Sequence, residues 1–270
     1  MKSKGKNAWK KRCFAILLVL FVLMSVTENS VFFNVAAQEK ESGSRIVYFG
    51  NYIQRKVTDE KELETLRIMY EDDLFTGGKL YYQGVHYAKK DDDFYKDASI
   101  AWRVLKDDGA YLTLLSDKVI DSRAYGSNDG WESSDIRKWL NNTFMENAFT
   151  EEEREQIAET TLRSKRLIYM KPSVVEITTD KVYLPQEEDV MNAEYGFSPS
   201  DLADRGRIAY KTAYLDPEEQ ASNWWLRGDP SWAYGNPENV RVSAEGSFVR
   251  WYMTWEYGIR PMMRIRKNAA

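Results

Sequence analysis

Two adjacent tryptophans, Trp224 and Trp225, constrain the fold of this chain more than any other feature. Side chains alternate between the two faces of a β-strand, so neighbouring tryptophans in a strand need apolar material on both faces. Each indole can bury on the order of 200 Å², which at about 25 cal/mol per Å² outweighs a single polar contact. We therefore predict a central strand, followed by Arg227, whose guanidinium several acceptors can hold.

The C-terminal residues 258–265 also alternate in polarity. One face would carry Ile259, Pro261, Met263 and Ile265, and the other Arg260, Met262, Arg264 and Arg266. This pattern predicts a closing strand. Because proline donates no hydrogen bond to a sheet, Pro261 places that strand near an edge or at its start.

Residues 1–37 have the composition of a signal peptide. Six basic residues within 2–12 precede an uncharged apolar run of 14 residues, 13–26, and small residues up to Ala37 supply a cleavage site. The run is shorter than the roughly 20 residues of a membrane-spanning helix. We expect cleavage near Ala37 and a secreted or cell-surface protein; without cleavage, the spacer 27–34 would let the segment stay as an anchor.

The charge that remains after cleavage limits the partners. Six of the 38 basic and one of the 42 acidic residues lie in 1–37, so residues 38–270 carry a net charge of −9. An acidic protein repels nucleic acid and anionic membranes, which excludes DNA and RNA and leaves membrane contact only through an uncleaved N-terminal segment. The only cysteine, Cys13, is removed too, which excludes disulfides within the chain, cysteine-ligated zinc and a cysteine nucleophile.

Local patterns predict one α+β domain over residues 46–266, after a flexible lead-in, 38–45. Strands 100–105 and 111–119 flank an Asp-Gly turn and should form a hairpin. Helices are expected in 58–74, capped by Thr58 or Asp59, and from Ser133 or Ser134 onward. The capping box from Thr150 to Glu153 opens another helix. The remaining predictions are strands at 45–54, 79–88, 174–178, 181–184, 240–242 and 248–255, a short helix at 186–192, and connections at 89–97, 121–130 and 229–239.

Several segments in fixed order carry a family resemblance. They are Trp102-Arg103-Val104-Leu105, Leu115-Ser116-Asp117-Lys118, the run from Trp131 through Ser134, Ile136, Arg137, Trp139 and Leu140 to Asn141, the run around Asp180, Trp224-Trp225-Leu226-Arg227, and Gly258-Ile259-Arg260-Pro261. Together they resemble a bacterial, mostly secreted family catalogued as a domain of unknown function. The resemblance covers residues 46–266.

A more distant resemblance concerns the fold. The aromatic strand and the closing Gly-x-Arg strand are similar to those of the C-type-lectin-like fold of formylglycine-generating enzymes. This implies antiparallel strands with a few short helices and long loops, and fold alone gives no function. Those enzymes use a cysteine pair with copper, whereas residues 38–270 contain no cysteine, so that activity does not carry over.

Few residues offer catalytic chemistry. His86 is the only histidine, between Val85 and Tyr87, and it reads as a polar strand residue. The sequence has no nucleophile elbow and no glycine-rich phosphate loop. Carboxylate clusters could form a glycosidase-like pair, at 91–93, 151–153, 187–189 or 218–219, but such runs are usually solvated faces or helix starts. We predict no catalytic residue and assign Arg137, Arg227 and Arg260 to structural bridges.

Aromatic residues near the C-terminus indicate binding. Trp232, Tyr234, Trp251 and Trp255 are our candidate ligand-binding residues, because aromatic faces stack on sugars or anchor protein interfaces. We predict no cofactor and no bound metal; oxygen ligands at 128–129, Asp135 or 236–239 leave calcium as a weak alternative. The expected function is a secreted, non-enzymatic recognition domain that binds an extracellular glycan or protein. The alternatives are a carboxylate-dependent hydrolase and a structural envelope module.

Overall fold

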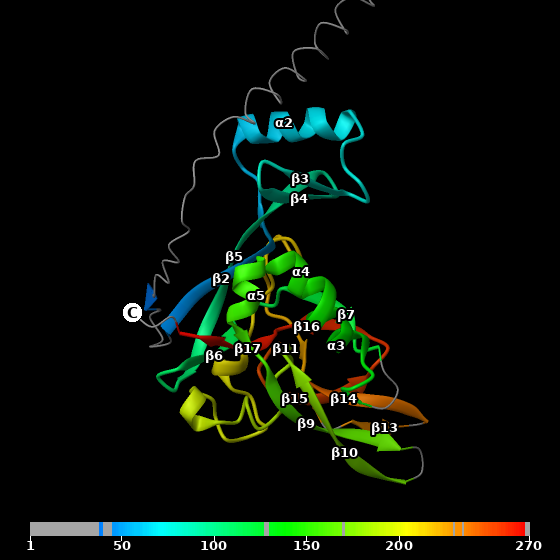
Figure 1. Ribbon diagram of the computed structural model, residues 1–270. Helices are drawn as coiled ribbons and strands as arrows, with labels where there is room; N and C mark the ends of the chain where they lie inside the picture. Colours follow the sequence, from blue (N-terminus) through cyan, green and yellow to red (C-terminus); the bar gives the residue numbers. More distant parts are fainter. Residues whose placement is uncertain are drawn as a thin grey trace, which may run out of the picture. The chain divides into compact units, whose positions relative to one another are not determined.

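The structure is a computed structural model that describes residues 38–39, 45–126, 130–168, 171–228, 230–233 and 235–267, with the backbone alone for 38, 39 and 172. The predicted signal peptide, residues 128–129 and Tyr234 lie outside the described residues. The described part is mostly antiparallel β-sheet with a few short helices (Figure 1).

The larger sheet is built on two long strands, β2 and β5. Its order is β1-β2-β5-β6-β17-β11, with β4 also on β5, β3 on β4 and β8 on β17. The strands are β1 (Gln38–Glu39), β2 (Arg45–Lys56), β3 (Lys79–Tyr82), β4 (Val85–Lys90), β5 (Asp93–Asp107), β6 (Tyr111–Ser116), β8 (Ile157–Ala158), β11 (Val182–Tyr183) and β17 (Met262–Arg266). The β2–β5 register shifts between Tyr48 and Asn51 and between Ile53 and Arg55.

The smaller sheet contains the tryptophan pair. Its order is β13-β14-β12-β16-β7, with β15 also on β14. The strands are β7 (Asp121–Ala124), β12 (Trp224–Trp225), β13 (Ser231–Ala233), β14 (Asn236–Val242), β15 (Phe248–Tyr252) and β16 (Glu256–Ile259). Strand β12 lies between β14 and β16, and both of its tryptophans are fully buried. The prediction of a central strand covered on both faces is confirmed.

A separate two-stranded hairpin joins β9 (Thr160–Ile168) and β10 (Lys171–Asp180). The sequence indicated only residues 174–178 of this hairpin as a strand. Only Leu162 and Ser164 of β9 are buried, which is too little apolar alternation for the sequence to predict a strand there.

The helices begin where the sequence places their caps. Asp59 accepts from the backbone N–H of Glu62 at 2.9 Å and caps α2 (Glu60–Glu71). Ser134 caps a continuous helical run of α3 (Asp135–Trp139), a π-helical turn η1 (Leu140–Phe144) and α4 (Met145–Ala148). The capping box of Thr150 and Glu153 opens α5 (Glu151–Gln156). Single 3-10 turns follow at η2 (Ala193–Tyr195) and η3 (Arg205–Arg207).

Several predicted connections are strands instead. Residues 89–97, predicted as a charged loop, belong to β4 and β5 except for a turn at Asp91 and Asp92. Phe94 and Tyr95 are buried between charged neighbours. Residues 121–130 include β7, and residues 229–239, predicted as a long loop, include the β13–β14 hairpin. Gln38 and Glu39 of the predicted lead-in pair with β2.

Two further predictions were wrong in kind. Residues 186–192 form turns rather than a helix, although Asp189 accepts from Gln186 N at 2.9 Å as the acidic residue at N3 of a capping box would. Residues 258–265 are not one closing strand. They end β16 in the smaller sheet and begin β17 in the larger one, with Arg260 and Pro261 as the crossing.

The apolar interior forms two clusters. The main cluster lies between the sheets and the α3–α4 run and includes Trp102, Trp131, Trp224 and Trp225. A small second cluster gathers Val57, Leu66, Tyr87 and Phe94 under α2, β3 and β4, which Figure 1 shows at one end of β2 and β5.

The irregular stretch between β11 and β12 contains a buried arginine, Arg207. The Arg207 guanidinium donates to the carbonyl oxygens of Val190, Ser198, Ser200, Leu202 and Gly246. Burial lowers the pKa of Arg207, but the group stays charged at neutral pH because an arginine pKa starts far above it. One side chain thus ties five backbone positions together without regular secondary structure.

Candidate functional site

Three of the four predicted ligand-binding residues lie along one edge region of the smaller sheet. Trp232 on β13 is opposite Pro237 on β14, and Trp251 on β15 is opposite Asn239 on β14. Because residues 237 and 239 are two apart on one strand, both tryptophans project from the same face. Trp255 lies in the turn between β15 and β16. We call Trp232, Trp251 and Trp255 the tryptophan surface.

Ring contacts fix the orientation of Trp251 and Trp255. Their ring centroids are 5.8 Å apart and their planes meet at 90°, an edge-to-face pair worth about 0.5–1.5 kcal/mol beyond area burial. The guanidinium carbon of Arg241 lies 5.7 Å from the Trp251 centroid and 4.5 Å from that of Tyr257. Arg241 also donates to the side-chain oxygen of Asn223. The indole of Trp255 therefore rests on a support that is itself held in place.

Exposure separates the tryptophan surface from the core tryptophans. Of the eight tryptophans in the described residues, five are buried: Trp102, Trp131, Trp139, Trp224 and Trp225. Trp255 is 54% exposed and Trp232 is 37% exposed, whereas Trp251 is partly buried against the main cluster. Trp255 and Trp232 can thus offer ring faces to a ligand, and Trp251 supports Trp255. The fourth predicted residue, Tyr234, lies outside the described residues.

The support given by Arg241 was missed at the sequence level. It lies two residues after Asn239 on β14, on the face that carries Trp251. The alternation of 240–242 shows that Arg241 points away from its two valine neighbours. Which aromatic rings it meets depends on the strand register, which the sequence does not give.

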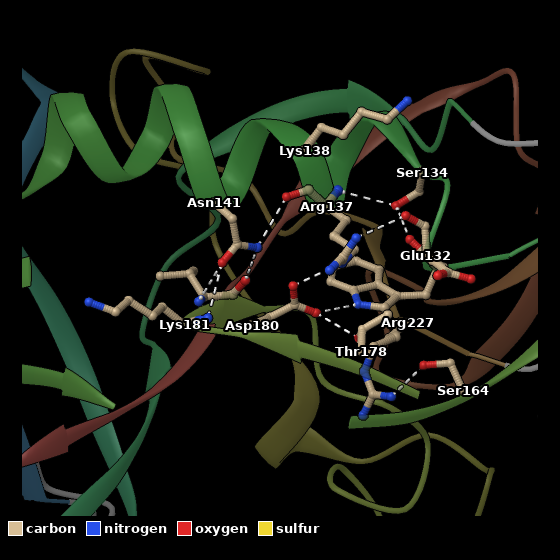
Figure 2. Close-up of polar contacts among 12 residues, drawn as sticks. Glu132, Ser134, Arg137, Lys138, Asn141, Ser164, Thr178, Asp180, Lys181 and Arg227 are labelled. Carbon is tan, nitrogen blue, oxygen red and sulfur yellow. Dashed lines mark hydrogen bonds and ion pairs between the residues drawn. The ribbon is translucent and has the colours of Figure 1, made fainter. Parts of the chain in front are cut away.

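The residues of two of the motif segments, 131–141 and the run around Asp180, form a structural network (Figure 2). The buried Asp180 carboxylate accepts from Trp131 Nε1 at 2.9 Å, Arg137 Nε at 2.8 Å and Thr178 Oγ1 at 2.8 Å. Asn141 donates to the carbonyl of Val182 and accepts from the N–H of Lys181. These contacts fasten α3 to the end of β10 and the start of β11. The Asp180 carboxylate and the Asn141 amide are therefore already paired within the fold.

Arg227 and Arg260 are also interior groups. Arg227 donates to the carbonyls of Leu184 and Arg163 and to Ser164 Oγ. Arg260 is fully buried, donates through Nε to the carbonyl of Ser116 at 2.8 Å, and lies 5.1 Å from the Trp224 ring centroid. Desolvation lowers the pKa of both guanidinium groups. Both have the structural role that the sequence predicted.

Several carboxylates of the predicted clusters accept hydrogen bonds or form ion pairs within the fold. Glu153 accepts from the N–H groups of Gly50 and Thr150. Asp93 pairs with Lys56 at 2.6 Å, and Glu219 pairs with Lys118. Burial raises the pKa of Asp189. Glu219 lines a small cavity together with Asp117, where it pairs with Lys118.

The residues considered for calcium are engaged as well. Asp135 pairs with Lys138 at 3.2 Å, and the buried Asn239 amide donates to the carbonyl of Leu226. Within the described ranges, no group of three or more acidic, histidine or cysteine side chains could hold a metal ion. No helix in the same ranges has the length and apolar character to cross a membrane.

Comparison with known proteins identifies a family whose function is unknown. No curated protein and no solved structure matches the chain. A family model described as "Domain of unknown function (DUF6273)" matches residues 109–267. This range begins after the first predicted motif, at 102–105, and contains the whole tryptophan surface. The chain belongs to this DUF6273 family of domains of unknown function.

Proposed function

We propose that this protein is a non-enzymatic recognition domain that acts outside the cell and binds a glycan through Trp255 and Trp232. The observation that carries the proposal is the exposed Trp255 ring, held at a right angle by Trp251, which Arg241 backs. A ring that is fixed before binding loses little conformational freedom when a sugar stacks on it. Trp251 supports the site, and Tyr234 belongs to the proposed site by its place in the sequence.

Other features support the remaining parts of this proposal. Export follows from the basic and apolar composition of residues 1–37, and the net charge of −9 for residues 38–270 disfavours nucleic acid. A C-type-lectin-like fold is part of the proposal. Mostly antiparallel sheets, short helices and the irregular stretch between β11 and β12 are consistent with it. Tryptophan is also common at the centre of protein interfaces, so a protein ligand is the second candidate.

The test is a binding screen of the purified full-length protein against glycans and bacterial cell-wall polymers, with calcium and with a chelator. We expect saturable binding that Trp255→Ala weakens at least tenfold and Trp232→Ala weakens less. Tyr210→Ala is the matched control, because Tyr210 is 53% exposed but lies outside the tryptophan surface.

Each outcome of the screen has a clear meaning. Binding that survives both tryptophan substitutions would place the site elsewhere. Failure to bind any glycan would remove the glycan proposal and leave a protein partner. Loss of binding in the chelator alone would add a calcium requirement to the proposal.

A further inference from the structure

A cavity of 440 Å³ lies away from the tryptophan surface, between the small cluster and the main body of the fold. Its walls come from β2, β3, β4 and β5 on one side, and from β7, α4 and the segment around Tyr214 on the other. This volume falls in the range of about 300–1,000 Å³ that is usual for small-molecule sites.

The cavity has aromatic walls whose rings are held from behind. Tyr52 meets Phe144 edge-on with centroids 5.3 Å apart, and Tyr214 meets Tyr95 edge-on at 5.3 Å. Tyr81 packs on His86 with centroids 4.6 Å apart. Tyr87 also lines the cavity. These tyrosines offer apolar ring faces, and the polar groups of the cavity lie beside them, so the walls suit a ligand that has both C–H and polar surface.

The polar groups of the cavity are balanced in charge. Lys79 and Arg123 line it together with two carboxylates, Asp97 and Asp121. Asp97 Oδ2 lies 3.2 Å from His86 Nδ1. Asp121 Oδ2 accepts from Tyr52 OH at 2.9 Å and pairs with Arg123 at 3.3 Å. Burial and Asp121 raise the pKa of Tyr52, so its hydroxyl stays protonated and donates.

We propose that this cavity binds a neutral saccharide residue, free or at the end of a chain. Two carboxylates disfavour an anionic ligand, and two cations disfavour a cationic one. A purely apolar ligand would leave several charged groups desolvated. A sugar offers hydroxyls that both donate and accept, and C–H faces that stack on tyrosine rings.

The same contacts favour binding over hydrolysis. A retaining or inverting glycosidase needs one carboxylic acid to protonate the leaving group and a second carboxylate as nucleophile or base. Here Asp121 is engaged by Tyr52, by Arg123 and by the N–H of Ser122. Asp97 is engaged by both the ring and the N–H of His86. Both carboxylates accept hydrogen bonds from these donors, and a carboxylate has room to accept a further one from a sugar hydroxyl.

Most of the cavity lies outside the segment that the family model matches. Nine of its thirteen lining residues precede residue 109, where the family match begins. The segment that completes the cavity is therefore not part of the matched domain.

The experiment is calorimetric titration of the full-length protein with glucose, galactose, mannose, N-acetylglucosamine and their disaccharides. Zwitterionic amino acids and inorganic phosphate serve as comparison ligands. Tyr81→Ala removes a wall whose side chain is 64% exposed, so the fold should tolerate it. Asp97→Asn keeps the shape of the side chain and removes its charge. Tyr210→Ala is the matched exposed tyrosine outside the cavity, and Trp255→Ala reports on the tryptophan surface.

We expect at least one neutral saccharide to bind saturably and to raise the Tm as its concentration exceeds the Kd. Tyr81→Ala and Asp97→Asn should each weaken this binding at least tenfold, while Tyr210→Ala leaves it unchanged. The inference is overturned if no saccharide binds or if only the charged comparison ligands bind. It is also overturned if only Trp255→Ala reduces saccharide binding, an outcome that would support the tryptophan surface instead. Circular dichroism checks that each variant is folded.

Discussion

Asp107 gathers three donors at the turn between β5 and β6. It accepts from Lys267 Nζ at 3.0 Å, from Gly109 N at 3.1 Å and from Arg45 Nη2 at 2.9 Å. These contacts, Lys267 first, lower its pKa to about 2. Because the unfolded pKa is about 3.9, the charged form stabilises the folded state above that pH. The contribution is lost as the pH falls from about 4 to about 2.

The measurement is the Tm between pH 6 and pH 2 for the wild type and Asp107→Asn. We expect the variant to be less stable at pH 6 and its Tm to fall less steeply below pH 4. The group is exposed, so added salt should shrink the difference. Glu64→Gln on the exposed face of α2 is the control. Parallel pH profiles for the wild type and Asp107→Asn would show that these contacts do not stabilise the fold.

Asp180 is the second residue whose charge the fold depends on, and here the carboxylate is buried. Asp180→Ala would leave Arg137, Trp131 and Thr178 without their common acceptor (Figure 2). Removing one partner of a buried pair costs about 3–5 kcal/mol. We expect a loss near the lower end, because Arg137 can reach water. Urea unfolding measures it, and Asp180→Asn should lose less.

A double substitution isolates the ion pair from the rest of this network. In Asp180→Ala with Arg137→Met, no unpaired guanidinium remains, so the loss should be smaller than the sum of the two single losses. Additive losses would show that Asp180 acts through Trp131 and Thr178 alone.

At the scale of elements, Gly258 sets how closely β16 packs against its neighbours. A Cβ at this position would lie 2.6 Å from Val119 Cγ1 and 2.8 Å from the carbonyl oxygen of Asn223. That carbonyl accepts from the N–H of Gly258, so it cannot move away without losing the contact. We expect Gly258→Ala to lower the free energy of unfolding by about 1–3 kcal/mol.

The control for this crowding is Gly77→Ala. Gly77 has a φ of 56° and nothing within 4 Å of an added Cβ, so this change measures the cost of the backbone conformation alone, about 1 kcal/mol. Chemical denaturation of both variants separates the two effects. A Gly258→Ala variant as stable as the wild type would mean that β16 can shift without cost.

The elements that the sequence predicts correctly carry their information locally. The Asp59, Ser134 and Thr150 caps each need only residues within one helical turn. The β5–β6 hairpin needs only its turn and its alternation. The charged start of β5 was missed because its apolar residues, Phe94 and Tyr95, are adjacent and are buried on opposite faces. Composition alone marks such a stretch as a loop.

Properties that depend on pairing could not be predicted in the same way. The alternation of residues 258–265 is continuous in the sequence, yet β16 and β17 belong to different sheets. The concentration of aromatic residues near the C-terminus is enough to predict the tryptophans of the proposed site. Their shared face and the contact with Arg241 depend on the register of β13, β14 and β15, which the sequence does not give. His86 had no motif, so its place in a cavity with Asp97 and Asp121 was not expected.

At the scale of the whole molecule, the two apolar clusters differ in size and in their relation to the family. The main cluster is formed largely by residues within 109–267, whereas the small cluster lies in the preceding segment. Glu62 of α2 joins this small cluster to the sheet, because it accepts from Tyr87 OH at 2.9 Å and from Lys96 Nζ at 2.6 Å. A small apolar cluster with few polar ties is expected to open at lower free energy than the main one.

Leu66→Ala tests this division directly. Leu66 is buried under α2, and its truncation should cost about 2–5 kcal/mol of local stability. Because Leu66 belongs to the small cluster, the loss should fall on α2, β3 and β4. Amide hydrogen exchange should rise there and stay unchanged in β6, β12 and β17, whereas Leu140→Ala in the main cluster should raise exchange throughout. A uniform rise with Leu66→Ala would show that the two clusters unfold as one unit.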